Sequence, residues 1–261
     1  MAGSGFGTNF RITTWGETHG AGVGVVVDGC PAGLPLERED VQKYLDRRKP
    51  GQSKYTTQRK EGDQVEILSG IFEGRTTGTP ISMVVYNKDQ RSKDYSNIKD
   101  IYRPGHADFT FDMKYGFRDY RGGGRSSGRE TIGRVAAGAV AAKVLKELGI
   151  EIKAYAKAIA GIEVSKDHFD FAEMNNNPFN MPDKEAAKLV QEKADQMIKE
   201  MDSIGGIIEC QITGMPVGIG ETVFDKLDAE LSKAIMSIGS VKGFEIGDGF
   251  EAANLRGSEN N

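Results

Sequence analysis

Apolar positions along this chain follow two different periods, and the two alternate from one end to the other. Short runs of β-branched and other apolar residues predict strands at 10–15, 23–27, 65–71, 81–86, 150–164 and 207–213. Apolar residues recur at helical spacing in longer stretches, at 36–48, 130–149, 183–201 and 227–238. The pattern therefore predicts an α+β protein in which strands and amphipathic helices share a core.

One short motif occurs twice, each time between a predicted strand and a predicted helix. Residues 29–34 read Gly-x-Pro-x-Gly-Leu, and residues 214–219 read Gly-x-Pro-x-Gly-Ile. Because the flanking elements match as well, we favour an internal duplication over a chance match of a short motif. The prediction is a single domain over 1–261, a duplicated β-α-β sandwich. Its antiparallel sheets flank a helical core, with pseudo-two-fold halves of about 1–150 and 151–261.

The second half reads as the shorter copy. In the first half, strand 65–71 is followed by a Thr-Gly turn and a returning strand, 81–86. In the second half, 244–250 is predicted as the counterpart of the outgoing strand, and polar residues 256–261 follow it. We therefore expect the second half to be incomplete, with an unpaired sheet edge that is open to another chain.

Composition narrows the class of protein. Charged residues make up 28% of the 261 and apolar residues 38%, which is typical of a soluble globular protein. No apolar run is long enough to span a bilayer, and the first ten residues lack the pattern of a signal peptide. The two cysteines, Cys30 and Cys210, are too few and too far apart to suggest a disulfide framework or a zinc site. We expect a cytoplasmic protein with no membrane partner and no metal.

Residues 118–134 hold five arginines and five glycines in a chain whose net charge is −4. The pair Ser127-x-x-Glu130 matches a capping box and predicts that a helix begins where the glycine run ends. A glycine-rich loop that leads into a helix presents backbone N–H groups and the positive end of the helix dipole, which suits a phosphate. The alternative is an arginine-rich surface loop ahead of an ordinary core helix.

Two known nucleotide- and nucleic-acid-binding patterns fit this stretch poorly. Residues 123–130 come close to a P-loop, but Arg129 replaces its lysine, Glu130 replaces its magnesium-binding hydroxyl, and no apolar strand precedes it. RGG-like segments bind single-stranded nucleic acid, but this chain has a pI of about 5.6 and the stretch leads into a core-type helix. We therefore expect no nucleic-acid partner, and RNA binding is the least favoured alternative.

The three histidines differ in their surroundings. His19 lies between Gly16 and Gly20 in a turn that links two predicted strands, where a histidine is seldom a packing residue. Its side chain titrates near neutral pH, so His19 is a candidate for acid–base chemistry. His106 lies in a similar turn, whereas His168 lies in a polar patch and is expected at the surface. A basic loop after the first helix is either a solvated charge run or an anion contact: Arg47, Arg48, Lys49, Lys54, Arg59 and Lys60.

Three motifs occur in one order along the chain. They are residues 16–20 (Gly-Glu-Thr-His-Gly), 103–108 (Arg-Pro-Gly-His-Ala-Asp) and 119–131 (Asp-Tyr-Arg-Gly-Gly-Gly-Arg-Ser-Ser-Gly-Arg-Glu-Thr). Together they strongly resemble the chorismate synthase family, and residues 216–228 and 241–247 continue the match. The resemblance covers essentially the whole chain, and three long motifs in register make it specific.

The resemblance implies a lyase of the shikimate pathway, which leads to aromatic amino acids. It implies the 1,4-anti elimination of phosphate from 5-enolpyruvylshikimate 3-phosphate to give chorismate, with reduced FMN required although there is no net redox change. It also implies a homotetramer, with NADPH as the candidate reductant in some members. The anionic load of substrate and flavin is compatible with arginines concentrated in glycine-rich loops of an acidic chain.

Family roles carry over by position. The resemblance assigns His19 to protonation of the departing phosphate, as a general acid, and His106 to donation near N1 of the flavin. The positions that match FMN-contacting residues are Arg125, Ser126, Ser127, Gly239 and Ser240, together with His106. The positions that match residues binding the phosphate groups of the substrate or of NADPH are Arg48, Lys54, Arg103 and Arg129.

The family continues past the last residue matched here. It carries a further glycine-rich segment that contacts the flavin, and a late Arg-His-Asp motif whose aspartate helps to deprotonate the substrate. No residue of this chain matches either one. We therefore expect a C-terminally truncated enzyme that by itself binds FMN weakly and turns over little. The alternative function is a non-catalytic flavin- or phosphate-binding fragment or subunit that needs a C-terminal partner.

Overall fold

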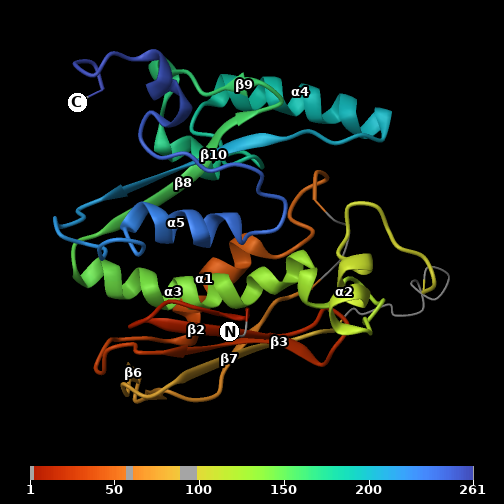
Figure 1. Ribbon diagram of the computed structural model, residues 1–261, viewed down its shortest axis with the longest axis vertical. Helices are drawn as coiled ribbons and strands as arrows, with labels where there is room; N and C mark the ends of the chain where they lie inside the picture. The colour runs from red at the N-terminus through yellow and green to blue at the C-terminus, as the bar shows by residue number, and fades with distance from the viewer. Residues whose placement is uncertain (1–2, 57–60, 89–98, 261) are drawn as a thin grey trace.

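Two antiparallel sheets lie on opposite sides of a layer of helices in the computed structural model (Figure 1). The structure describes residues 3–56, 61–88 and 99–260. The larger sheet contains, in spatial order, β1 (Gly5–Phe6), β2 (Arg11–Gly16), β3 (Gly22–Asp28), β7 (Ile81–Tyr86) and β4 (Val65–Ile67). The smaller sheet contains β10 (Gly206–Thr213), β8 (Glu151–Ile159) and β9 (Ile162–Glu163). A separate pair is formed by β5 (Ile71–Phe72) and β6 (Arg75–Thr76).

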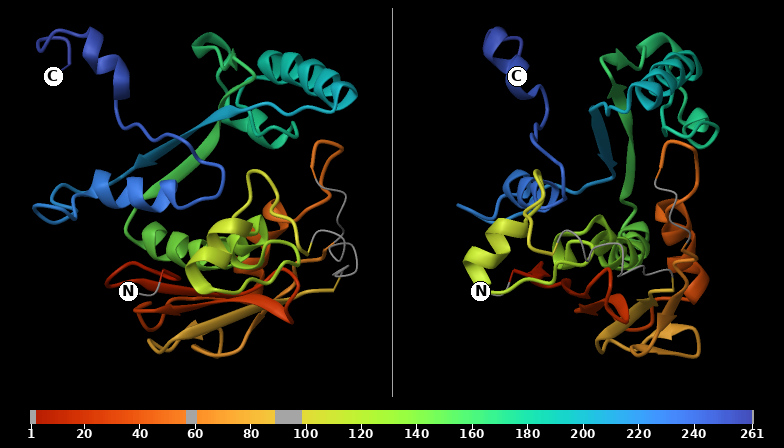
Figure 2. Two further views of the ribbon diagram at one scale, coloured as in Figure 1. Left: turned by 45° about the vertical axis from the view of Figure 1, so that its right-hand side comes forward. Right: turned by 90° about the vertical axis from the view of Figure 1, so that its right-hand side faces the viewer.

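The helices divide between the centre and the rim of this arrangement. They are α1 (Arg38–Arg48), α2 (Asp108–Tyr115), α3 (Thr131–Glu147), α4 (Lys184–Glu200) and α5 (Leu227–Met236). Short 3-10 helices are η2 (Gly124–Ser126), η3 (Gly128–Glu130), η4 (Lys166–His168), η5 (Phe171–Asn175) and η6 (Gly249–Asn254). The views in Figure 2 place α1 and α3 against the larger sheet and α4 at the far side of the smaller one. The first strand, β1, belongs to the larger sheet, whereas η6, close to the end of the chain, lies on the side of the smaller sheet (Figure 1).

The main core forms where α1 and α3 cover the larger sheet. Val23, Val25 and Val27 of β3 are fully buried, because these alternate residues share the face of the sheet that α1 and α3 cover. Glycines let α3 approach the sheet: a Cβ on Gly133 would lie 3.0 Å from the carbonyl oxygen of Gly24. This close approach fixes the first turn of α3 directly above the end of β2.

A second, smaller core lies between α4 and the smaller sheet. It contains Ala156, Met181, Ala186, Ala187 and Val190. The helix begins firmly, because the carboxylate of Asp183 accepts backbone hydrogen bonds from residues 185 and 186 at 2.9 and 3.0 Å. The opposite side of β10 stays open, with Ile207 and Ile208 more than half exposed.

The predicted duplication is visible in the backbone. Gly29 and Gly214 end matching strands with φ of 84° and 75°, and Gly33 and Gly218 have φ of 82° and 87°. A Cβ on Gly29 would collide with the carbonyl of residue 9, and one on Gly214 with the carbonyl of residue 149. Both turns lead into a helix, α1 or α5. The predicted fold class, an α+β sandwich with a pseudo-two-fold repeat, is confirmed.

Several element predictions need correction. The predicted strand 65–71 divides into β4 and β5, and 150–164 folds back on itself as β8 and β9 around a turn at Ala160 and Gly161, both with positive φ. Residues 244–250 form no strand; they run as irregular chain into η6. The predicted capping box is also wrong. Ser127 caps η3 instead, and the Glu130 carboxylate accepts from Thr14 and Arg134.

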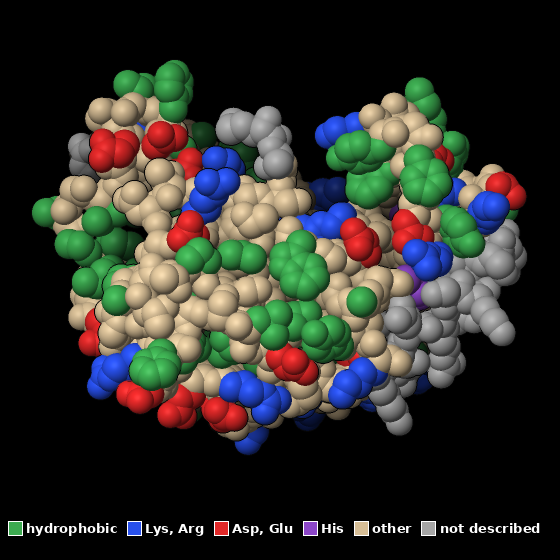
Figure 3. Space-filling model, turned by 90° about the horizontal axis from the view of Figure 1, so that it is seen from below, with side chains coloured by type: hydrophobic (Ala, Val, Ile, Leu, Met, Phe, Trp, Pro, Cys, Tyr) green, Lys and Arg blue, Asp and Glu red, His purple; other side chains and the backbone are tan. Residues whose placement is uncertain are grey.

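The outer surface carries mixed charge. Seen from below, Lys and Arg side chains are interspersed with Asp and Glu around patches of hydrophobic side chains (Figure 3). Among the helices of the described part of the chain, none has the length and apolar character that crossing a bilayer requires.

Candidate functional site

The site begins at the turn between β2 and β3. This turn carries Thr18 and His19, whose residues are only 5% and 7% exposed. Asn87, directly after β7, holds it from the neighbouring strand: its side-chain Nδ2 donates to the carbonyls of Glu17 and Gly20, both at 2.9 Å. Its backbone N–H donates to Ala21 at 3.1 Å. The turn is therefore bound to the sheet at both ends, with His19 between the two contacts.

The glycine run lies directly against the His19 ring. Gly122, Gly123 and Gly124 have φ of 63°, 85° and 53°, a conformation that residues with a Cβ rarely adopt. A Cβ on Gly122 would lie 2.5 Å from Cδ2 and 2.7 Å from Nε2 of His19. The glycines of this motif therefore allow the backbone to take positive φ angles and allow the loop to lie against the His19 ring.

Arg129 forms the buried centre of the site. It is 5% exposed and is the middle residue of η3, two residues before α3 begins. Its Nε donates to the Asn87 Oδ1 at 2.7 Å, and its Nη1 to the Asp63 Oδ1 at 2.8 Å. Its Nη2 lies 3.7 Å from a carboxylate oxygen of Glu61. A buried guanidinium needs such partners, because an unpaired charge in the interior costs several kcal/mol.

A second arginine shares the same carboxylate. Arg48, the last residue of α1, donates from Nη1 to the Asp63 Oδ2 at 2.7 Å and from Nε to the Thr131 hydroxyl at 3.3 Å. Asp63 is 2% exposed, and its carboxylate lies between the two guanidinium groups, with one oxygen bonded to each. Its backbone has a positive φ of 43°. Arg48 and Arg129, which are far apart in the sequence, are brought together here.

Two buried polar atoms of the site have no hydrogen-bond partner among the described residues: Nη2 of Arg129 and the hydroxyl of Thr18. Buried donors are normally satisfied, so such atoms mark places where a ligand group or water completes the structure. Both donors are suited to an anion. The N-terminus of α3 begins two residues after Arg129 and adds the positive end of a helix dipole.

The other residues of the arginine-glycine stretch mainly hold the loop in place. Arg125 donates to the carbonyls of Gly16 and Thr14 and to the Thr14 hydroxyl. Ser126, which is exposed, donates to the carbonyl of Gly123, and Ser127 accepts from the backbone of Arg129. These contacts fix the loop to the end of β2.

The motif at 103–108 forms a compact turn ahead of α2, a helix that the sequence did not predict. Arg103 binds both carboxylate oxygens of Asp108, at 2.8 and 2.9 Å, and this pairing lowers the pKa of Asp108 to about 2. Arg103 also lies near the glycine run, since Nη2 is 4.0 Å from a Cβ placed on Gly123. His106 is exposed, with Nδ1 3.0 Å from the carbonyl of Pro104.

Lys54 and the turn at 239–240 lie apart from this centre. The ammonium of Lys54 pairs with the carboxylate of Asp195 on α4, at 2.7 Å, and the Tyr55 hydroxyl donates to the same carboxylate at 2.9 Å. Gly239 and Ser240 are exposed after α5. This region is tied to the start of α3 because Arg134 donates to the hydroxyl and carbonyl of Ser237. Arg59 and Lys60 lie outside the described residues.

Sequence reasoning missed four residues of the site: Thr18, Glu61, Asp63 and Asn87. Glu61 and Asp63 fall within a charge-rich loop that reads as solvated, yet both are buried. Asn87 follows a strand as many surface residues do. One local signal could have found them: Glu61 and Asp63 are two acidic residues next to a run of basic ones. A buried arginine needs a carboxylate of this kind as its counter-charge.

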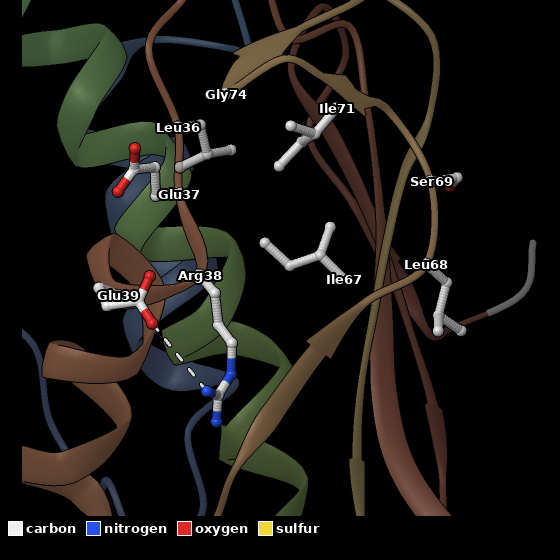
Figure 4. Close-up of a pocket in the computed structure, with 9 residues that line it drawn as sticks. All are labelled: Leu36, Glu37, Arg38, Glu39, Ile67, Leu68, Ser69, Ile71 and Gly74. Carbon is white, nitrogen blue, oxygen red and sulfur yellow. Dashed lines mark ion pairs between the residues drawn. The ribbon is translucent and has the colours of Figure 1, made fainter.

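A hollow elsewhere on the molecule carries less chemistry. It has a volume of about 480 Å³ and lies between the start of α1 and the strands β4 and β5 (Figure 4). Its ionisable residues are Glu37, Arg38 and Glu39, with Arg38 and Glu39 paired at 4.0 Å. It lies at the start of α1, and Arg48 lies at the other end of that helix, about 15 Å along its axis. In the described part of the chain, no group of three or more His, Cys, Asp or Glu side chains is arranged to hold a metal ion.

Known proteins match this chain from end to end. A sequence model of the chorismate synthase family matches residues 10–261. The chain is 70% identical to a chorismate synthase from Lachnospira eligens and 58% identical to one from Chloroflexus aggregans, over 100% of its own length and 71% of theirs. It superposes on a crystal structure of chorismate synthase with a TM-score of 0.78 at 33% identity, covering 96% of this chain and 73% of that one. On the sequence match over its whole length, and on the fold built around His19 and Arg129, this chain belongs to the chorismate synthase family.

Proposed function

We propose that the His19 turn and Arg129 form the phosphate end of the active site, with His19 as the general acid and Arg129 as the anchor for the leaving group. The observation that carries this is a pair of buried donors that lack a hydrogen-bond partner among the described residues, Arg129 Nη2 and the Thr18 hydroxyl, on the elements that carry the site. Arg129 Nη2 has the Glu61 carboxylate at ion-pair distance, 3.7 Å, and can still donate a hydrogen bond to an anion. Arg48 is held on the same carboxylate as Arg129 and supports its orientation. Arg103 lies at the other side of the glycine run and is assigned to the same phosphorylated ligand.

The reaction of this family is a lyase reaction on a small molecule, the last step of the shikimate pathway to aromatic amino acids. Phosphate leaves 5-enolpyruvylshikimate 3-phosphate by 1,4-anti elimination, and chorismate is formed. The departing phosphate carries developing negative charge, which a guanidinium stabilises and a nearby acid neutralises by proton transfer. Burial of His19 and Arg129 removes competing water and strengthens both effects.

We assign reduced FMN to the surroundings of the glycine run. When bound, reduced FMN would lend electron density to the substrate and recover it as phosphate leaves, so that flavin and product show no net redox change. The residues proposed to hold it are Arg125, Ser126, Ser127, His106, Gly239 and Ser240. Since the side chains of Arg125 to Ser127 are bonded within the loop, their proposed part is to shape the loop whose backbone faces the flavin.

Several wider features belong to the same proposal. We take 1–261 as a single domain made of two halves and expect a cytoplasmic homotetramer, as the family resemblance implies. NADPH is the candidate reductant, with Arg48 and Lys54 as its phosphate contacts. For Lys54 this requires release from Asp195. The base that takes the substrate proton is assigned, by the same resemblance, to an aspartate motif that no residue of this chain matches.

The test uses the three histidines as matched variants. His19→Ala and His106→Ala should each lower turnover by about two to four orders of magnitude, the range for loss of a general acid or base. His168→Ala should leave turnover near that of the wild type, because His168 is exposed and forms an ion-pair contact with Glu185 at the surface. The measurement is an anaerobic assay with dithionite-reduced FMN and substrate, made on each variant complemented with the C-terminal segment of a relative. Phosphate binding by calorimetry is measured for each variant alone. Equal effects of all three substitutions would contradict the assigned roles.

A further inference from the structure

One carboxamide links the two groups to which the proposed function gives chemical roles. The side chain of Asn87 contacts the turn that carries His19 and the guanidinium of Arg129 at once. Its Nδ2 donates to residues 17 and 20, two positions before and one after His19, at 2.9 Å each. Its Oδ1 accepts from Arg129 Nε at 2.7 Å.

A side-chain amide at position 87 can donate hydrogen bonds to the His19 turn and accept one from Arg129. Backbone carbonyls only accept hydrogen bonds and a guanidinium only donates them, so the linking group must donate on one side and accept on the other. Asparagine satisfies this with its two halves, and the partners fix its orientation. An aspartate could accept from Arg129 but would place negative charge against two carbonyl oxygens. A leucine could do neither.

The His19 turn has little stiffness of its own. It is bounded by Gly16, with a φ of 88°, and by Gly20. Arg129, by contrast, is held firmly by Asp63 and lies at the start of the long helix α3. The link through Asn87 therefore transfers the rigidity of the Arg129 centre to the turn.

We propose that Asn87 is a positioning residue that fixes the His19 turn relative to Arg129, so that an anion bound at the Arg129 Nη2 is placed within reach of His19. This inference rests on the proposed function for its two end points. What the inference adds is a role for Asn87, which is proposed to contact neither the ligand nor the reacting atoms and to act through His19 and Arg129. Productive geometry at such a centre has to be held to a fraction of an ångström, which is the task of groups that support the reacting side chains.

The chain offers a matched control in its second half. Asn177 is half-buried like Asn87, and its Nδ2 donates to the carbonyls of Glu173 and Met181 at 2.8 Å each. Its Oδ1 accepts from two backbone N–H groups, at 3.1 and 3.2 Å. Asn177→Asp therefore removes the same kind of bonds in a loop before α4, away from His19 and Arg129.

The experiment compares Asn87→Asp, Asn177→Asp and the wild-type chain by two readouts that need no turnover. These are the binding of inorganic phosphate by calorimetry and the ring signals of the three histidines by NMR at one pH. We expect Asn87→Asp to weaken phosphate binding about tenfold, as loss of support for a charged hydrogen-bonding group implies. We also expect it to shift the His19 signals and leave those of His106 and His168 in place. Asn177→Asp should lower the melting temperature without either effect.

Other outcomes separate this inference from the function on which it rests. If Arg129→Ala weakens phosphate binding but Asn87→Asp changes neither phosphate binding nor the His19 signals, the positioning role is refuted and the site stands. If Arg129→Ala binds phosphate as the wild type does, the proposed function fails first. Should Asn87→Asp not fold, Asn87→Ser decides by the same comparison, since a serine hydroxyl is too short to span both partners. In an active preparation, the effect should fall on kcat as well as KM.

Discussion

Replacing Gly122 by alanine should disable the His19 site while leaving the fold largely intact. Two costs can be separated. Gly122 has a φ of 63°, so any residue with a Cβ there costs about 1–2 kcal/mol in backbone strain. The added Cβ would also lie 2.5 Å from Cδ2 of His19, whereas an ordinary carbon–carbon contact needs about 3.5 Å. The His19 ring or the loop must therefore move by about 1 Å.

A displacement of this size at a reacting group costs about 10²-fold in rate, so we expect turnover of Gly122→Ala to fall by about two orders of magnitude. The loss of unfolding free energy should be about 2–5 kcal/mol, the sum of about 1–2 kcal/mol of strain and about 1–3 kcal/mol of local overpacking. The assays are anaerobic turnover with reduced FMN after complementation with the C-terminal segment of a relative, and, on the chain alone, the NMR signals of the His19 ring and urea unfolding.

Gly149→Ala is the matched control for strain alone. Gly149 has a φ of 73°, and a Cβ there would meet no atom within 4 Å. It lies at the far end of α3, about 25 Å along the seventeen-residue helix from the site. This variant should lose only the strain energy and keep wild-type turnover and His19 signals. If Gly122→Ala retained the turnover and His19 signals of Gly149→Ala, the packing of the glycine run against His19 would not matter for function.

Two further predictions concern the loops around the site. Asp108→Asn should cost about 1–2 kcal/mol at pH 7 after allowance for solvent screening, because Arg103 lowers the pKa of Asp108 to about 2. A depressed carboxyl pKa stabilises the fold above about pH 4 and loses this effect as the pH falls towards 2, so the deficit in urea unfolding should shrink over that range. An equal deficit at pH 7 and near pH 2 would contradict the pairing. Arg125→Ala should lower stability by about 1–3 kcal/mol, since three hydrogen bonds to Gly16 and Thr14 are lost, and should also weaken FMN binding. Unfolding by urea and FMN fluorescence titration measure the two effects, and unchanged FMN affinity would place the flavin elsewhere.

Local sequence determined most of the element pattern of this protein. The β-branched run of β3 and the periodic faces of α1, α3, α4 and α5 follow from apolar spacing, which needs no distant partner to be read. The paired motifs at 29–34 and 214–219 revealed the duplication, because glycine is required wherever the backbone takes a positive φ against a neighbouring strand. His19 was visible for a similar reason, as an ionisable side chain in a glycine-bounded turn.

Local sequence led to wrong predictions where the structure of a segment depends on a partner that is distant in the chain. Residues 244–250 have an apolar pattern suited to a strand, but a strand exists only when another pairs with it, and none in the described part of the chain does so. Ser127 and Glu130 have the spacing of a capping box, but the Glu130 carboxylate bonds to Thr14 and Arg134 instead. The Glu130 carboxylate could bond to the backbone N–H of Ser127 in a capping box or to Thr14 and Arg134. In the structure it bonds to Thr14 and Arg134.

The centre of the site was decided by tertiary structure alone. Arg129 is buried only because Asp63, Glu61 and Asn87 reach it from segments 42 to 68 residues away in the chain. Nothing within a few residues of Asp63 or Asn87 marks either one as different from a solvated loop residue. Lys54, which reads as part of the same basic loop as Arg48, faces Asp195 on α4 instead. Charge pairing in the interior depends on which segments the fold places side by side. The desolvation cost of burying a guanidinium is offset only when those segments bring carboxylates and hydrogen-bond acceptors to it.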